Sequence, residues 1–231
     1  YLRDCGRTYM RSSEYSDDTG ALEQYVDLRI TNLTEYHAYA TQWNGVRGQF
    51  ANINLRSPMS SGSSGYVWNS EMTFVELRIE FLGRTEAWNT SRSAREQTDA
   101  AQPLVLRRTF FGFFDFDAGG PNWEGILKEP EAIQFDPLAH SEVLPESSEL
   151  LRRGSWNETV SEEQLASFLS AAEAHAYLVS WSTPVIAASS TGYGSDNPTS
   201  YDTLTALQAN RSVMVMLEDM SSFRVRFAIT Y

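Results

Sequence analysis

Two aspartates, Asp115 and Asp117, stand where a phenylalanine-rich stretch, residues 108–116, runs toward the pair Gly119 and Gly120. On a β-strand, alternate residues point to the same face, so the two carboxylates would lie side by side at the end of that strand. Calcium binds roughly six to eight oxygen ligands, and carboxylates are among those it prefers. The pair could therefore provide the first ligands of a calcium site.

A second interpretation of the same aspartates is structural. The spacing of an EF-hand is not present, because Ile126 stands where that loop needs its last acidic ligand and Glu124 comes too early. Aspartates beside glycines also cap turns, and their charges can pair with neighbouring arginines, here Arg107 or Arg108. A calcium ligand pair and a turn cap therefore both stay open from the sequence.

Other residue types with catalytic chemistry show no productive spacing. His37, His140 and His175 form no metal-binding motif, and no G-x-S-x-G nucleophile motif or dinucleotide fingerprint occurs. Thirty acidic residues make some pair of carboxylates inevitable, so a glycan-active hydrolase is the least favoured interpretation. We expect no enzymatic activity and no cofactor other than the calcium considered above.

Four Asn-X-Ser/Thr sequons predict N-glycosylation. They occur at Asn32, Asn89, Asn157 and Asn210, where chance would give about two for this composition. A chain that begins at Tyr1 agrees either with removal of a signal peptide or with a fragment. Together these features predict an extracellular or cell-surface glycoprotein. Loop tryptophans could also stack on sugars or pack on the chain's own glycans, and those expected in loops are Trp43, Trp88, Trp123 and Trp156.

The composition limits the classes of partner. With 42% hydrophobic residues among 231, the chain can bury a substantial core. Its formal charge of −12 opposes binding to nucleic acid or to an anionic membrane, and no apolar stretch is long enough to span a bilayer. Cys5 is the only cysteine, which excludes a disulfide within the chain and leaves its own role open.

Alternating apolar and polar residues predict a mainly β fold. The clearest strands are 22–30, 74–82 and 222–231, while 203–210 and a longer stretch, 161–177, carry helical patterns. No alternation of strands with crossover helices occurs. We therefore predict an antiparallel β-sandwich or jelly roll with one or two short helices, forming a single domain over residues 21–231. Residues 1–20 are polar without a sustained period and predict an N-terminal arm or linker.

Local patterns make further structural predictions. A hairpin turn is expected at Asn44–Gly45, and a flexible loop over residues 57–65. The phenylalanine-rich strand carries aromatic residues on both faces, so one face should lie in the main core and the other under a covering loop or a neighbouring subunit. On the other strands the charged residues should face away from the core; these are Glu23, Asp27, Arg29, Glu76, Arg78, Glu80, Arg224 and Arg226.

Two stretches, "TFFGFFDFDAG" (109–119) and "SDNPTSYDTLTALQANRSVMVMLEDMSSFRVRF" (195–227), carry a resemblance. They resemble a β-rich domain of uncharacterised secreted proteins from algae and other protists. That domain has a phenylalanine-rich strand ending in D-x-D and a late "DNP…LT…Q…RSV…F" segment. Some of these proteins look like subunits of glycosylated extracellular fibrils. The resemblance implies an extracellular, surface-associated protein and brings no catalytic residues.

These observations favour a structural subunit of a filament or cell-surface layer that associates with copies of itself. The N-terminal arm could add a strand to the open sheet edge of the next subunit, with Tyr1, Leu2, Tyr9 and Met10 as anchors. The alternative is a carbohydrate-binding or calcium-dependent adhesion module that uses loop tryptophans together with Asp115 and Asp117.

Overall fold

The structure is a computed structural model, and all structural statements here concern the residues that it describes. These are 2–10, 22–36, 44–47, 50–55, 60–62, 65–67, 73–84, 101–121, 127–128, 131–136, 141–153, 181, 183–192 and 197–229. The predicted helix 161–177 and the predicted loop tryptophans lie outside these ranges.

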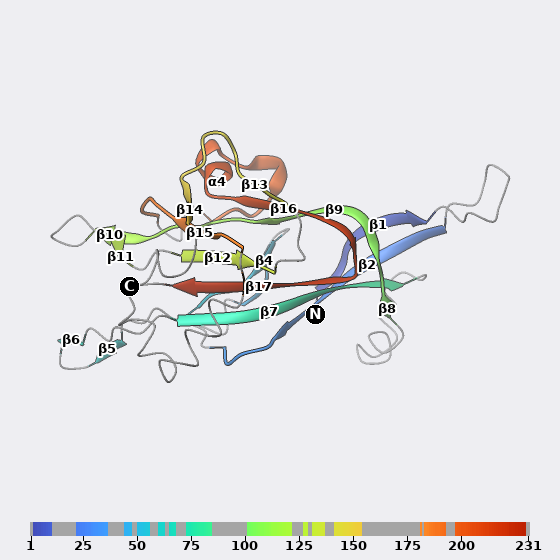
Figure 1. Cartoon of the computed structure of the whole chain (residues 1–231), viewed down its shortest axis with the longest axis horizontal. Coiled ribbons are helices and arrows are strands. Elements are labelled where there is room, and N and C mark those ends of the chain that lie inside the picture. Colours follow the sequence, from blue (N-terminus) through green and yellow to red (C-terminus); the bar gives the residue numbers. More distant parts are fainter. Residues whose placement is uncertain are drawn as a thin grey trace.

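An eight-stranded sheet, here called the main sheet, forms one layer of the fold (Figure 1). Its neighbouring strands are antiparallel, and β8 (Gln102–Pro103) pairs with β7 beside the principal path. Along that path the order is β1 (Leu2–Met10), β2 (Leu22–Asn32), β7 (Thr73–Arg84), β17 (Ser222–Ile229), β12 (Glu131–Phe135), β15 (Val185–Ala188) and β14 (Leu150–Arg153).

A three-stranded antiparallel sheet, here called the second sheet, forms the other layer. Its order is β13 (Ser141–Val143), β16 (Val213–Met220) and β9 (Leu106–Phe113). Three separate strand pairs accompany it: β3 (Gly45–Arg47) with β4 (Phe50–Asn52), β5 (Ser60–Gly62) with β6 (Gly65–Val67), and β10 (Gly119–Pro121) with β11 (Leu127–Lys128). The mainly β, antiparallel fold class predicted from the sequence is confirmed.

Two short helical segments lie between β15 and β16. The 3-10 helix η3 (Tyr201–Thr203) is followed by the α-helix α4 (Ala206–Asn210). Thr205 caps α4 by accepting a hydrogen bond from the Gln208 backbone N–H, while the Gln208 side chain accepts one from the Thr205 N–H. This reciprocal capping box satisfies two amide groups that a short helix would otherwise leave unpaired. It confirms the helix predicted within residues 203–210.

The hydrophobic core lies between the two sheets. Phe113 of β9 meets Phe135 and Phe227 of the main sheet, with ring centroids 5.4 and 5.5 Å apart. Phe81 of β7 stacks on Phe223 of β17 at 6.1 Å. Burial of each such side chain contributes about 1.5–3 kcal/mol. The inward positions predicted on residues 74–82, which include Val75, Leu77, Ile79 and Phe81, are all buried.

The two layers are joined at a corner where single chain segments pass from one sheet to the other. Only Ser221 separates β16, in the second sheet, from β17, in the main sheet. Near the end of β16, Asp219 has a positive φ of 52°. The β8–β9 segment makes a similar passage, and Figure 1 shows both segments curving at the same end of the molecule. The Phe81 N–H donates to the Ser221 carbonyl across this corner, at 2.8 Å.

The outer face of the main sheet differs from the prediction, because several of its charged side chains are buried. Asp27 is 0% exposed and receives two hydrogen bonds from Arg84, and Glu76 and Arg226 are 2% and 1% exposed and pair with each other. Trp181 covers Arg226, with its ring centre 3.8 Å from the guanidinium carbon. A charged residue that alternates with apolar ones can therefore be buried when a partner of opposite charge lies beside it.

The predicted N-terminal arm also differs, because residues 2–10 form β1 at the edge of the main sheet. Leu2 lies opposite Leu28, and Gly6 to Met10 run in regular register with Val26 to Leu22. A β-bulge interrupts the ladder between Leu2 and Gly6, where Cys5 lies. The polar composition of this segment did not indicate a strand, because β1 has a described neighbour on one side only and can carry polar residues.

Two predicted loops are wrong in their details. Gly45 belongs to β3, where it lies opposite Asn52 with a φ of 125°, and the pairing of β3 with β4 continues to Arg47 opposite Phe50. The stretch 57–65, expected to be a loop, contains β5 and the start of β6, which pair with each other. Both stretches are rich in glycine, serine or asparagine, which favour turns without fixing their position.

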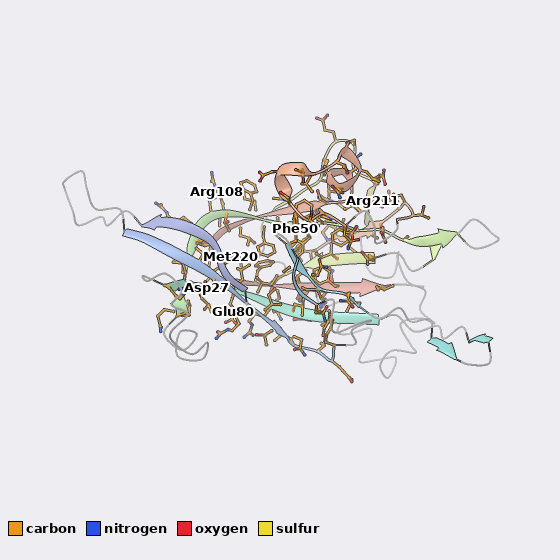
Figure 2. The ribbon with its side chains drawn as sticks, turned by 180° about the vertical axis from the view of Figure 1, so that it is seen from behind. Asp27, Phe50, Glu80, Arg108, Arg211 and Met220 are labelled. Atoms are coloured by element: carbon orange, nitrogen blue, oxygen red, sulfur yellow. The ribbon has the colours of Figure 1, made fainter. Side chains whose placement is uncertain are left out.

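The phenylalanine-rich strand is covered on one face and only in part on the other. Phe111 and Phe113 point into the core, while Phe110 is 57% exposed and Phe114 packs edge-on against Phe50, labelled in Figure 2, at 5.0 Å. The core face is therefore confirmed, while cover of Phe110 by a loop or by a neighbouring subunit stays a prediction. The strand ends at Phe113, and the next turn places Phe116 in the same core.

Candidate functional site

The carboxylates singled out in the sequence, Asp115 and Asp117, lie in a tethered segment directly after β9. Asp115 adopts a positive φ of 70°, a left-handed conformation that aspartate tolerates better than most residues. On either side of Asp117, the Phe116 N–H donates to the Arg211 carbonyl at 3.2 Å and the Ala118 N–H donates to the Ser190 carbonyl at 3.0 Å. The left-handed turn breaks the strand alternation that the sequence suggested for both aspartates.

A third carboxyl group, that of Glu131 at the start of β12, lies near both aspartates. The Glu131 N–H donates to the Asp117 carbonyl at 3.0 Å. Burial raises the pKa of the Glu131 carboxyl well above its ordinary value, and the negative charges of Asp117 and Asp115 raise it further. A hydrogen bond with the Asp117 backbone opposes this shift in part. The site therefore favours a protonated Glu131 beside two aspartates.

An arginine lies at the other side of the site. Arg211, at the C-terminal end of α4 and labelled in Figure 2, is 7% exposed in its side chain and forms an ion pair with Glu149 at 3.0 Å. Its guanidinium also donates to the Thr191 carbonyl at 2.6 Å. The pKa of Glu149 is lowered, first by a hydrogen bond from Ser190 and then by Arg211. Arg211 thereby joins the residue before β14 to the segment after β15.

Gly192 explains how the acidic and basic parts of the site approach each other. A Cβ atom at this position would clash with the carboxylate of Asp117 and with the guanidinium of Arg211. The Gly192 N–H donates to the Ala118 carbonyl at 3.1 Å, which holds the glycine against the segment after β9. The space that a side chain would occupy is therefore filled by Asp117 and Arg211.

The contacts of Asp117, Gly192 and Arg211 hold separate segments of this chain together. Among the described residues, no group of three or more His, Cys, Asp or Glu side chains is arranged to hold a metal ion. Calcium binding at Asp115 and Asp117 stays a prediction. Arg108, one of the arginines expected beside them, instead pairs across the second sheet with Glu218 at 2.6 Å.

Two of the four sequons fall on described residues. Asn32 is exposed at the end of β2, and its side-chain amide donates to the Thr34 carbonyl at 3.0 Å. Asn210 is half-buried at the end of α4, where its side-chain oxygen accepts a hydrogen bond from Ser147 at 2.6 Å. Asn89 and Asn157 lie outside the described residues. Of the two described sequons, Asn32 has the surroundings better suited to a bulky glycan.

The proposed anchors of the arm belong to β1, except for Tyr1, which lies outside the described residues. Leu2, Tyr9 and Met10 are placed opposite Leu28, Glu23 and Leu22, respectively, of the neighbouring strand. The backbone thus presents these residues in extended form at the edge of the main sheet.

Sequence reasoning missed Glu131, Glu149, Gly192 and Arg211. No local motif connects them to Asp115 and Asp117, because the sheet topology brings them together from distant parts of the chain. The only indication in the sequence was the late segment containing Arg211, which formed part of the family resemblance. No family model, no curated protein and no solved structure matches this chain.

Proposed function

We propose that this protein is an extracellular, N-glycosylated structural subunit of a filament or cell-surface layer. Copies of the chain would join head-to-tail by adding strands to one another's sheets, and the subunit would have no enzymatic activity. The observation that carries the proposal is the position of β1 at the edge of the main sheet. The segment expected to reach a neighbouring subunit is an extended nine-residue strand at the edge of the main sheet.

An edge strand supports assembly because its outer N–H and C=O groups are available to another strand. Such an edge is a ready template for association unless it is short, bulged or covered. In the described part of the chain, β1 pairs with β2 alone, and the bulge in its ladder is confined to the stretch between Leu2 and Gly6. Residues 6–10 keep a regular register and leave a uniform edge for pairing.

Glycosylation supports the same function. Asn32 is exposed, and the neighbouring Leu33 is a large apolar side chain that is 40% exposed. A glycan on Asn32 would shield this apolar surface and limit contacts at that position. A charge of −12 further opposes random side-by-side association of copies, which favours contacts at a few defined edges.

Electron microscopy of the purified, glycosylated chain tests the proposal. We expect ordered filaments or layers, and we expect a variant lacking residues 1–20 to stay monomeric. Circular dichroism and thermal unfolding of that variant will establish whether the rest of the sheet is intact. A Thr8→Pro variant provides a second test, because proline removes one backbone donor from β1 without shortening the chain. The proposal fails if the full chain stays monomeric at every concentration tested.

A second candidate function is a carbohydrate-binding or calcium-dependent adhesion module. The observation in its favour is the negative charge of Asp115 and Asp117, which raises the pKa of Glu131 and which a bound divalent cation would neutralise. A calcium titration followed by thermal unfolding, with magnesium as the control, tests it directly. A glycan array with and without calcium then tests sugar binding.

A further inference from the structure

Asn44 and Gly45 form the only Asn-Gly pair of the chain, and they lie at the start of β3. In such a pair the backbone nitrogen of glycine can attack Cγ, the side-chain carbonyl carbon of asparagine, because glycine has no side chain to obstruct the approach. Gly45 is exposed and has a φ of 125°. Among the described residues other than its chain neighbours, no atom lies within 4 Å of where its Cβ would be. The glycine is therefore unhindered on the side of the missing Cβ.

The side-chain oxygen of Asn44, Oδ1, is surrounded by hydrogen-bond donors. The backbone N–H and the side-chain amide of Asn54 donate to it at 3.0 and 2.6 Å, and the Tyr36 hydroxyl lies 2.9 Å away. A backbone N–H can only donate, so the Asn44 atom that faces it is the oxygen. Among the described residues, no hydrogen bond holds the amide nitrogen of Asn44. The oxygen is therefore fixed, whereas the nitrogen can leave.

The three donors have the geometry of an oxyanion hole. Attack on Cγ moves negative charge onto Oδ1, and donors roughly 2.7–3.1 Å from such an oxygen stabilise the charge as it develops. The Tyr36 hydroxyl also lies 2.8 Å from the Asn54 carbonyl oxygen, so its one proton has two acceptors. Because a charged acceptor forms the stronger hydrogen bond, the hydroxyl turns toward Oδ1 when the charge appears. The donors therefore bind the transition state more tightly than the intact amide.

The hydrophobic core keeps Tyr36 in position and protonated. The Tyr36 side chain packs against the core, as do Ile53 and Leu55 on either side of Asn54. Burial raises the pKa of the Tyr36 hydroxyl above its ordinary value of 10.0, and its hydrogen bonds with Asn44 and Asn54 oppose this shift only in part. The hydroxyl therefore retains the proton that it donates at neutral and mildly alkaline pH, where the backbone nitrogen of an Asn-Gly pair reacts.

We propose that Asn44 is a site of intramolecular deamidation, at which Tyr36 and Asn54 stabilise the reacting oxygen. The Gly45 nitrogen gives its proton to water and forms a bond with Cγ of Asn44. The bond between Cγ and Nδ2 then breaks, and Nδ2 takes up a proton and leaves as ammonia. This modification is independent of the proposed function.

Water completes the reaction by opening the cyclic imide. Cleavage between Cγ and the Gly45 nitrogen gives aspartate at position 44, whereas cleavage at the main-chain carbonyl carbon gives isoaspartate, the main product in an unconstrained chain. The donors around Oδ1 activate Cγ in this step as well, so the folded protein favours aspartate. The same donors then hold the new carboxylate through charge-assisted hydrogen bonds.

Incubation of the full chain at mildly alkaline pH, followed by peptide mapping with mass spectrometry, tests the proposal. We expect Asn44 to convert faster in the folded protein than in the same chain unfolded in urea, with aspartate as the main product of the folded protein. Tyr36→Phe should slow the folded reaction at least about tenfold and leave the reaction in urea unchanged. An Asn44→Asp variant provides the standard that identifies the product.

Thr183→Val is the matched control for Tyr36→Phe. It also removes a half-buried hydroxyl, one that donates to the Phe135 carbonyl at 2.6 Å, and should leave the rate at Asn44 unchanged. Circular dichroism establishes that each variant is folded. If Tyr36→Phe does not fold, Asn54→Ala replaces it, because this change removes the side-chain donor and keeps the backbone N–H.

Two results would overturn the proposal. Slower conversion of Asn44 in the folded wild type than in urea would show that the hydrogen bonds protect the amide. An unchanged folded rate in Tyr36→Phe, or in Asn54→Ala where that variant is used, would show that the donors do not stabilise the reacting oxygen.

Discussion

Glu76 on β7 and Arg226 on β17 lie directly opposite each other in the main sheet and form an ion pair with a distance of 3.0 Å. Both side chains are almost fully buried, and the ring of Trp181 lies over the guanidinium of Arg226. Arg224 extends the contact by pairing with Glu76 at 3.2 Å and with Asp136 at 2.7 Å. The outer face of the sheet thus carries a connected set of ion pairs.

The first prediction concerns this buried pair. Glu76→Gln leaves the charge of Arg226 buried without its carboxylate, so the free energy of unfolding should fall by about 3–5 kcal/mol. Chemical denaturation measures the loss. The control is Glu80→Gln on the same strand, since Glu80 pairs with Arg29 at the surface. That substitution should cost less than about 1 kcal/mol, because solvent screens an exposed pair. Equal losses in the two variants would contradict the prediction.

The second prediction concerns the pH dependence of stability. The folded state raises the pKa of Glu131 above its ordinary value of 4.5. Between that value and the raised pKa, the unfolded chain has released the proton while the folded chain retains it, so this group lowers stability as pH rises. Glu131→Gln removes the effect. The variant should therefore gain in melting temperature relative to the wild type as the pH rises above the ordinary pKa of 4.5.

Glu149 provides a control of opposite sign. Its pKa is lowered in the folded state by Ser190 and Arg211, so its contribution is complete above the ordinary value of 4.5 and is lost as pH falls through the lowered pKa. Glu149→Gln should therefore destabilise the protein near neutral pH, and the difference from the wild type should shrink in acid. If the stability of both variants relative to the wild type changes with pH in the same direction, the pKa values of Glu131 and Glu149 are not shifted in opposite directions.

The third prediction concerns Gly192. Alanine at this position has to displace Asp117 and Arg211, which are held by their own contacts, and should cost about 1–3 kcal/mol. Gly112→Ala on β9 is the comparison. There the added methyl group meets the sulfur atom of Met214 and the ring of Phe114, and the methionine can adjust. Urea denaturation should rank Gly192→Ala as the more damaging change, and the reverse order would argue against a packed Asp117–Arg211 contact.

The fourth prediction concerns glycosylation. If the protein is glycosylated as proposed, Asn32→Gln should reduce its intact mass by one complete N-glycan after expression through a secretory pathway, since Asn32 is exposed at the end of its strand. Mass spectrometry before and after enzymatic deglycosylation measures this. Thr34→Ala removes the same sequon, and it also removes the hydroxyl group that accepts a hydrogen bond from the Glu76 N–H at 2.9 Å. It should therefore lose the glycan and some stability, whereas an unchanged mass in both variants would exclude Asn32 as the attachment site.

The sequence predicted most of the strands because their core residues alternate with polar ones, as Phe223 and Val225 do with Arg224 and Arg226. It failed where a tertiary contact decided the outcome. Asp27 and Glu76 look like solvent-facing positions on their own strands, and only the neighbouring strands supply the arginines that allow their burial. The aspartates at the end of β9 were visible as a pair, but Glu131 reaches them through sheet pairing that no local pattern encodes.

The place of β17 in the main sheet determines when this sheet can be completed. β17 lies between β7 and β12, yet it follows every other described strand in the chain. During synthesis β7 must wait for a neighbour more than a hundred residues downstream, as shown by the separation of 150 residues between Glu76 and Arg226. The main sheet therefore closes only after residues 222–229 have been made. If Asn32 is glycosylated during synthesis, as the proposed function requires, the glycan is added while the main sheet is still incomplete.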